Sequence, residues 1–191
     1  MSVLDIIGSV IGLVYIVSEY RASRWFWPSS LLMSAFYMVI YFNARCYANA
    51  SICIYNFVVS VYGILVWRGI VQSRERAERP IGSCPVRLWP LFLGATALMS
   101  VGFYYLLGAL GESSLPWIDG ISSALTITGM WMLAQKYWQQ WFCWMVVEPL
   151  MIVLCLLSGL YFSAAMYLVY EVFCVLGVVR WRREYLENKE S

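Results

Sequence analysis

Three residues, Trp141, Trp144 and Glu148, have the types and the spacing expected of a ligand-binding face. They stand at positions i, i+3 and i+7, so an α-helix places both indole rings and the carboxylate on one side. Glu148 is the only charged residue between Lys136 and Glu171, so this side is expected at membrane depth. An indole face attracts a cation by about 1–2 kcal/mol, and a carboxylate inside a membrane is costly enough to indicate a functional site. The spacing therefore predicts that this face, and above all its acid, has a functional role.

A structural explanation of these residues stays open. Glu148 could form a hydrogen bond to a neighbouring helix or lie near a water-filled vestibule. Pro149, directly after it, is expected to break or kink the helix, either at the site or at a hinge. Trp138 stands near the expected membrane boundary, where tryptophan belongs to the interfacial belt, whereas Trp141 and Trp144 lie deeper.

A second belt of polar residues is expected at similar depth in the segments 47–67 and 160–180. Its predicted substrate-binding members are Cys53, Asn56, Tyr167, Tyr170 and Glu171. Hydrogen bonding between helices, typically worth under about 1 kcal/mol per pair, is the alternative role for these residues. Hydroxyl groups that often bond back to their own helix are weaker candidates, and they are Ser122, Ser123, Thr126 and Thr128.

The rest of the chain consists of the apolar segments that must position these residues. Charged residues make up 13% of the 191 residues, against about 25% in a soluble domain. Apolar runs long enough to cross a hydrocarbon core of about 30 Å recur from end to end, which predicts a polytopic membrane protein without a soluble domain. The expected spans are 3–20, 26–43, 47–67, 88–109, 117–135, 140–157 and 160–180. The first span lacks the features of a cleaved signal peptide and is expected to be retained.

The basic residues support seven spans and set an orientation. Arg45 is the one basic residue in the connections on one side of the membrane. The other twelve lie on the side of the C-terminus, and they are Arg21, Arg24, Arg68, Arg74, Arg76, Arg79, Arg87, Lys136, Arg180, Arg182, Arg183 and Lys189. Because basic residues concentrate in cytoplasmic loops, the N-terminus is expected outside and the C-terminus in the cytoplasm.

An offset of 114 residues aligns the two halves of the chain without a gap, from Asp5 to Arg68. The identical pairs include Asp5 with Asp119, Trp27 with Trp141, Tyr47 with Tyr161, Gly63 with Gly177 and Trp67 with Trp181. Two three-helix repeats separated by one helix are parallel, because the middle helix carries the chain back across the membrane. The predicted fold class is an all-α integral membrane protein with seven transmembrane helices in a 3+1+3 arrangement. Asp5 and Asp119 are expected to cap the N-termini of the first and fifth helices and to complement their dipoles, rather than to contact a ligand.

This arrangement divides the chain into five parts. They are a first three-helix repeat at 1–68, a cytoplasmic loop at 69–87, a linker transmembrane helix at 88–110, a second three-helix repeat at 117–182 and a cytoplasmic tail at 183–191. The loop has alternating Arg and Glu followed by Pro80, Gly82 and Pro85, a composition typical of a solvated linker.

Several motifs of the chain are shared with a known family. They are Trp27-Pro28, Tyr47-Ala48, Gly63 with Trp67, Asp119, the stretch KYWQQWFCW from Lys136 to Trp144, Gly159-Leu160-Tyr161, and Gly177 with Trp181. On these motifs the chain resembles the Pnu vitamin transporter family over nearly its full length. The resemblance implies a SWEET-like layout, a tendency to form homotrimers, and facilitated uptake by alternating access through the bacterial inner membrane. It also implies a cytoplasmic kinase that traps the substrate by phosphorylation.

Two departures from the nicotinamide riboside members of that family bear on the substrate. Glu148 and Cys53 stand where those members commonly have Asn and Gln. The thiamine-type branch is therefore the first choice, because thiamine has a permanently cationic thiazolium ring and an aminopyrimidine that can share two hydrogen bonds with a carboxylate. The alternative is nicotinamide riboside, also a cation, or another nucleoside-like molecule carried on the same fold.

The composition argues against other functions. The chain has no histidine and its six cysteines form no C-x-x-C pair, so no metal site, cofactor or disulfide framework is predicted. No nucleophile–base pair indicates an enzyme, and a net charge of +2 is too small to indicate nucleic acid. The only lysines, Lys136 and Lys189, lie outside the expected bundle, which excludes a retinal-type sensor. The expected partners are a small cationic vitamin and the lipid bilayer, and a scaffold without transport remains an alternative.

Overall fold

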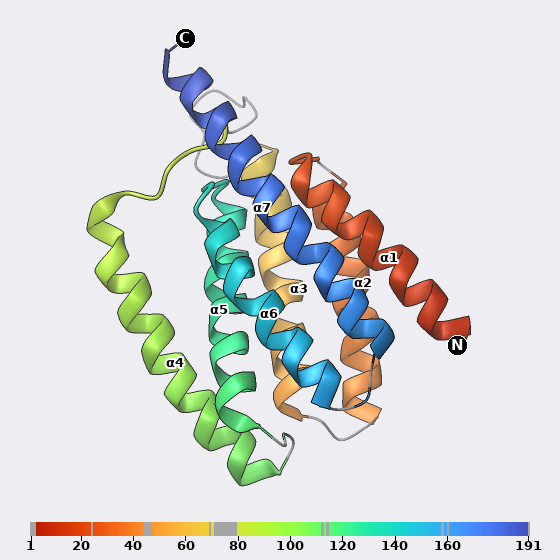
Figure 1. Cartoon of the computed structure of the whole chain (residues 1–191). Coiled ribbons are helices and arrows are strands. Elements are labelled where there is room, and N and C mark those ends of the chain that lie inside the picture. The colour runs from red at the N-terminus through yellow and green to blue at the C-terminus, as the bar shows by residue number, and fades with distance from the viewer. Residues whose placement is uncertain are drawn as a thin grey trace. The chain divides into compact units, whose positions relative to one another are not determined.

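The computed structural model in Figure 1 describes residues 3–23, 25–43, 47–68, 70, 80–111, 113, 115–157, 159 and 161–190. The described residues form seven α-helices and one short 3-10 helix. They are α1 (Val3–Tyr20), α2 (Phe26–Asn43), α3 (Tyr47–Trp67), η1 (Val86–Leu88), α4 (Trp89–Leu110), α5 (Pro116–Ala134), α6 (Gln140–Leu157) and α7 (Tyr161–Glu190). The predicted all-α fold with seven helices is confirmed. The side chain of Asp5 and the charged run at 71–79 lie outside the described residues.

The helices follow the apolar runs of the sequence, with one clear exception at the end of the chain. Among the described residues, four helices are long and apolar enough to cross a membrane by length and composition alone, namely α3, α4, α6 and α7. The helix α7 extends beyond the predicted membrane span 160–180 and continues to Glu190. Its 30 residues extend about 45 Å at 1.5 Å per residue, against a hydrocarbon core of about 30 Å. Much of the predicted tail at 183–191 is therefore helical.

The chain divides into two compact units, Met1–Arg79 and Pro80–Ser191. In the first unit α2 packs along α3 and contacts α1. In the second unit α4 packs along α5, α5 along α6 and α6 along α7. The helix with most of the candidate residues, α6, thus lies between α5 and α7.

Hydroxyl groups link helices inside each unit. In the first unit Ser60 Oγ and Ser30 Oγ form a hydrogen bond of 2.9 Å, which joins α3 to α2. In the second unit Thr96 Oγ1 lies 2.7 Å from Thr128 Oγ1, which joins α4 to α5. Such bonds are worth less than about 2 kcal/mol in membranes, so they fix the alignment of helices that close packing already holds together.

The turns that lead into α2 and α6 have the same backbone geometry, 114 residues apart. Ala22 and Lys136 both have a positive φ, of 48° and 54°, which is uncommon for residues that carry a side chain. The N–H of each donates at 2.9 Å to the carbonyl oxygen three residues earlier, on Glu19 and Leu133 respectively. The backbone of the two units therefore supports the internal repeat.

An aromatic contact is repeated with the same offset. In the first unit the indole of Trp27 lies against Gly63 and meets the ring of Trp67 edge to face, with centroids 5.5 Å apart. The residues that form the same arrangement in the second unit are Trp141, Gly177 and Trp181. The spacing Gly-x-x-x-Trp, which recurs at the end of each repeat, thus accommodates a tryptophan from the preceding helix.

Residues 80–85, here named the strap, are docked on the turn between α5 and α6 in the second unit. The Gly82 N–H donates to the Lys136 carbonyl at 2.9 Å, and the Trp138 N–H donates to the Gly82 carbonyl at 3.1 Å. These two bonds form an isolated parallel β-bridge between Gly82 and Tyr137. A loop thereby holds the start of α6 in place.

The side chain of Gln139 completes the strap. Its Oε1 accepts a hydrogen bond of 3.0 Å from the Cys84 N–H, and its Nε2 donates one of 2.6 Å to Ser83 Oγ. Cys84 is 3% exposed and packs in an apolar cluster with Met132 and Tyr137. The prediction of a solvated linker is wrong for this part of the loop, because Cys84 is buried and bonded to Gln139, 55 residues away. The composition of the loop gives no sign of this contact.

Candidate functional site

The predicted face forms on α6. Trp141 is fully buried, and Trp144 and Glu148 are each 8% exposed. One turn before Trp144 stands Gln140, which is also fully buried. Gln140, Trp144 and Glu148 follow one another at successive turns, and we name this row the α6 ladder. The helix continues through Pro149, so the expected break does not occur there.

The ring of Trp144 is held from two sides. Its Nε1 donates a hydrogen bond to Oε1 of Gln140, one turn earlier on the same helix. On α5 the ring passes over Gly129, where an added Cβ would lie 3.3 Å from Cζ2 of Trp144. The absence of a side chain at Gly129 makes space for this indole, so the orientation of the ring is set by α5 and Gln140 together.

Trp141 has a different environment from Trp144. Its indole lies against the backbone of Gly177 on α7 and meets Trp181 edge to face, with centroids 5.7 Å apart and planes at 87°. Its Nε1 has no hydrogen-bond partner among the residues that the structure describes. The close packing gives Trp141 a clear structural role between α6 and α7, while its contact with a ligand stays a prediction.

The predicted residues of α7 lie within one turn of each other. The rings of Tyr167 and Tyr170 meet edge to face, with centroids 5.9 Å apart. Glu171 is half-buried, and its Oε2 atom has no hydrogen-bond partner within the described part of the chain. A partly buried acid next to two phenol rings is a second polar group inside the second unit.

Cys53 and Asn56 belong to α3 in the first unit and are described there by themselves. Cys53 is 8% exposed and Asn56 is half-buried. The Asn56 carbonyl accepts a hydrogen bond of 2.6 Å from Ser60 Oγ, whereas its side-chain Oδ1 is buried without a partner among the described residues. Asn56 therefore keeps a free acceptor in its side chain.

The first repeat carries different side chains at the positions of the α6 ladder. The equivalents of Gln140, Trp144 and Glu148 in α2 are Phe26, Ser30 and Ser34, and all three are buried. Ser30 is bonded to Ser60 and closes the space between α2 and α3. The amide, the indole and the acid of the α6 ladder therefore have no counterparts at the equivalent positions of the first repeat.

The weaker candidates separate into structural and open groups. Thr128 Oγ1 donates to the Ala124 carbonyl at 3.0 Å and meets Thr96, so its hydroxyl is used between helices. Ser122 Oγ is buried with no partner among the described residues and stays a candidate. Asp119 lies in the first turn of α5, where an acid complements the helix dipole, and accepts a hydrogen bond from Ser113 Oγ. The prediction that Asp119 caps this helix is wrong, because Leu115 stands at the N-cap and no side chain in the described part of the chain caps it.

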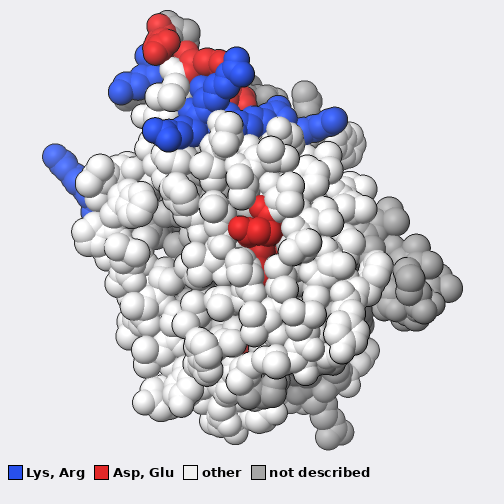
Figure 2. All heavy atoms as spheres, viewed as in Figure 1, with Lys and Arg blue, Asp and Glu red and all other residues white. Residues whose placement is uncertain are grey.

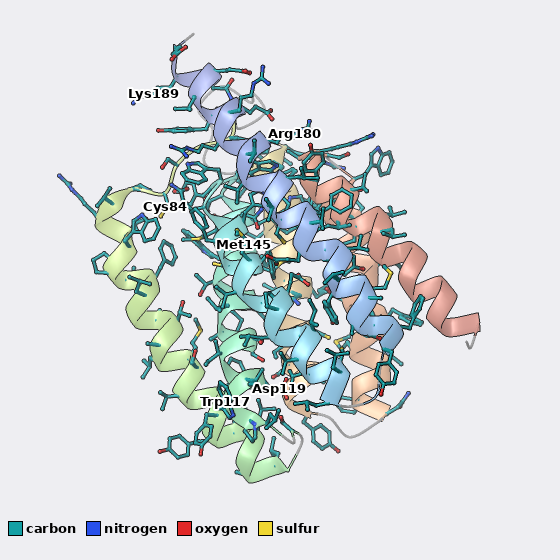
Figure 3. All side chains as sticks on the ribbon, in the orientation of Figure 1. Cys84, Trp117, Asp119, Met145, Arg180 and Lys189 are labelled. Carbon is teal, nitrogen blue, oxygen red and sulfur yellow. The ribbon has the colours of Figure 1, made fainter. Side chains whose placement is uncertain are left out.

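The basic residues of the second unit are concentrated toward one of its ends. Figure 3 shows Cys84 and Arg180 toward one end of this unit, Trp117 and Asp119 at the opposite end, and Met145 between them. Figure 2 shows Lys and Arg gathered around the C-terminal part of α7, above a largely uncharged surface with one acidic patch. The Arg182 guanidinium lies 5.8 Å from the centre of the Trp138 ring. Trp138 therefore lies beside a basic residue of α7, and its location at the membrane interface stays a prediction.

Gln140 was not predicted as a site residue, although it lies within the motif KYWQQWFCW. Glutamine is uncharged and common near membrane boundaries, so it gave no signal by type. Its position four residues before Trp144 and eight before Glu148 was the available signal, since this spacing continues the same helical face. Among the described residues, no group of three or more His, Cys, Asp or Glu could hold a metal ion.

The sequence of this chain is similar to those of known membrane transporters. The family model described as nicotinamide mononucleotide transporter matches residues 2–183. The nicotinamide riboside transporter PnuC of Escherichia coli (strain K12) is 20% identical, with 95% of this chain and 85% of that protein covered. The riboflavin/roseoflavin transporter RibM of Streptomyces davaonensis is 26% identical, with 93% and 83% covered.

A solved structure shares the fold. The crystal structure of the vitamin B3 transporter PnuC matches with a TM-score of 0.73 at 21% identity, covering 96% of this chain and 82% of that one. The prediction of a seven-helix membrane transporter rather than an enzyme is confirmed. Because the family model covers nearly the whole sequence, this chain belongs to the nicotinamide mononucleotide transporter family and is a multi-pass membrane transporter of the PnuC type.

Proposed function

We propose that this chain carries a vitamin with a positively charged heteroaromatic ring across the membrane by facilitated diffusion. The observation that carries the proposal is the α6 ladder, in which the buried carboxylate of Glu148 stands one turn from the buried indole of Trp144. A carboxylate at membrane depth costs about 2.5–3.5 kcal/mol, and a bound cation offsets that cost. The indole adds a cation–π attraction on the order of 1–2 kcal/mol.

Two vitamins of this class are candidates. Nicotinamide riboside contains a pyridinium ring and is named as the substrate of the PnuC relatives. Thiamine contains a thiazolium ring, and the carboxylate of Glu148 suits its aminopyrimidine as well as its charge. Riboflavin, named for one relative, is neutral and gains less from Glu148. The proposal therefore gives nicotinamide riboside and thiamine precedence over riboflavin.

The direction of net transport would follow from trapping inside the cell. A uniporter only equilibrates its substrate, so a cytoplasmic kinase that phosphorylates the vitamin would drive continued uptake. The basic residues at the C-terminal part of α7, Arg180, Arg182 and Arg183, support a cytoplasmic C-terminus in a bacterial inner membrane. The homotrimer implied by the family resemblance stays a prediction.

Binding to the purified full chain tests the proposal. Isothermal titration calorimetry in detergent would compare nicotinamide riboside, thiamine and riboflavin at the same protein concentration. The proposal expects at least one of the two cations to bind at least tenfold more tightly than riboflavin. Tighter binding of riboflavin than of both cations would overturn it, and the relative order of the two cations selects between them.

A further inference from the structure

The amide of Gln140 has two ends in different surroundings. The side chain is fully buried, and its Oε1 accepts the hydrogen bond from Trp144 Nε1. An indole N–H can only donate, so this bond requires that the amide oxygen, and not the nitrogen, faces Trp144. The nitrogen at the other end, Nε2, has no hydrogen-bond partner among the residues that the structure describes.

The first repeat has an apolar residue at the position equivalent to Gln140. Phe26, the equivalent residue in the first unit, is also fully buried, and its ring packs against Trp27 with centroids 4.9 Å apart. An apolar side chain therefore fits this point of the frame. A buried donor without a partner is unfavourable, so an amide at position 140 indicates a partner that is not part of the described chain.

The position of Gln140 points to the ligand as that partner. On the α6 ladder it stands one turn from Trp144 and two turns from Glu148, on the same side of the helix. In the proposed function Glu148 binds the positive charge of the ligand and Trp144 its flat ring. The remaining polar groups of such a ligand would then lie near the other residue of the ladder, Gln140. The free N–H of Gln140 would meet an acceptor there.

We propose that Gln140 is a substrate-binding residue whose Nε2 donates a hydrogen bond to an uncharged oxygen of the transported vitamin, a sugar hydroxyl or a ring carboxamide. This inference rests on the proposed function, since it takes a cationic nucleoside-type vitamin as the ligand. Gln140 has two tasks in this account. Its oxygen orients Trp144, and its nitrogen recognises the ligand.

A mutant cycle with truncated ligands separates these tasks. Calorimetry would measure wild type and Gln140→Met with three cations: nicotinamide riboside, N-methylnicotinamide, which lacks the ribose, and the pyridine riboside, which lacks the carboxamide. Methionine keeps the size of the side chain without its amide. Gln140→Asn, which keeps an amide on a shorter stem, replaces Gln140→Met if that variant does not fold.

The expected result is a loss of about tenfold in affinity for nicotinamide riboside in the variant. The loss should disappear with one of the two truncated ligands, and that ligand shows whether the sugar or the carboxamide accepts the bond. An equal loss with all three ligands would overturn the inference, because Gln140 would then act only through Trp144 or through folding. If wild type binds thiamine but none of these three cations, the proposed function stands and this inference is overturned. If wild type binds neither thiamine nor any of the three, the proposed function itself fails.

Discussion

The indole of Trp141 lies directly against Gly177, so α6 and α7 meet through a ring on one side and bare backbone on the other. A Cβ atom at position 177 would overlap that ring, and Trp181 closes on the ring from 5.7 Å. Gly177→Ala is therefore expected to lower the free energy of unfolding by about 1–3 kcal/mol, the usual cost of overpacking. Unfolding of the purified protein in detergent, followed by tryptophan fluorescence, measures the change.

The repeat and α4 provide the controls for this substitution. Gly63→Ala should behave in the same way, because a Cβ there would overlap Trp27. Gly94→Ala on α4 should be neutral or slightly stabilising, since an added Cβ has nothing within 4 Å and alanine favours helix. Equal stability of the variants at 177 and 94 would contradict the account of the ring contact.

The strap should protect Cys84 from chemical modification. In a variant with Cys84 as its only cysteine, Gln139→Ala removes the two side-chain bonds to Ser83 and Cys84. Maleimide should then label Cys84 about thirtyfold faster, since each of the two bonds is worth roughly 1 kcal/mol. Ser83→Ala removes one of the two bonds and should give an intermediate rate. Unchanged labelling in both variants would show that the strap does not depend on Gln139.

The same thiol gives a pH dependence. Burial raises the pKa of the Cys84 thiol above its ordinary value, so the reactive thiolate is scarce at neutral pH. Labelling should accelerate as pH rises toward this raised pKa. The pKa of this thiol is higher in the folded protein than in the unfolded chain. The neutral thiol therefore contributes fully to the free energy of unfolding below the unfolded-state pKa, and this contribution is lost as the pH rises through the folded-state pKa. A Cys84→Ser variant should lack this alkaline loss, and an identical pH profile in both proteins would refute it.

The hydroxyl bond between α4 and α5 should have a small, measurable effect. Thr128→Val removes the partner of Thr96 while keeping the shape of the side chain. The expected cost is on the order of 0.6 kcal/mol, the average for hydrogen bonds between membrane helices. Thr126→Val on the same helix is the matched control. A larger loss at 126 than at 128 in thermal unfolding would contradict the role given to this bond.

Hydropathy predicted most helix boundaries because apolar runs alternate with polar turns. It did not predict the structure of two polar segments, the end of α7 and the strap, where contacts with other side chains hold the backbone. The end of α7 is charged, and its helix is supported by the 2.8 Å pair of Arg183 with Glu187, four residues apart. The strap depends on a contact between Cys84 and Gln139, far apart in the chain. No local pattern encodes such a contact.

The candidate site was predicted only in part. The acid and the indoles of α6 were visible, since rare residue types at helical spacing are a strong signal. The distinction between Trp141, packed on Gly177, and Trp144, held by Gln140, required the neighbouring helices. Sequence spacing alone gave both rings the same role.

The charge of Glu148 should be recognised by the ligand. Glu148→Gln keeps the size of the side chain and removes its charge, so it should weaken nicotinamide riboside by about tenfold to a hundredfold, as expected for a bond to a charged group. The reduced dihydropyridine form of the same riboside is neutral and should lose much less. Competition binding with both forms measures the difference. Equal losses of affinity for the cationic and the neutral riboside would contradict a role for the charge of Glu148 in binding.

Uptake by the reconstituted protein tests the central claim most directly. Proteoliposomes that contain the full chain, without any ion gradient, would be given radiolabelled nicotinamide riboside or thiamine, with Gly94→Ala and Glu148→Gln measured beside wild type. The account predicts that wild type and Gly94→Ala equilibrate at least one of these cations, and that Glu148→Gln does so at least tenfold more slowly at low substrate concentration. Uptake of neither cation by wild type, or equal uptake by Glu148→Gln, would contradict it.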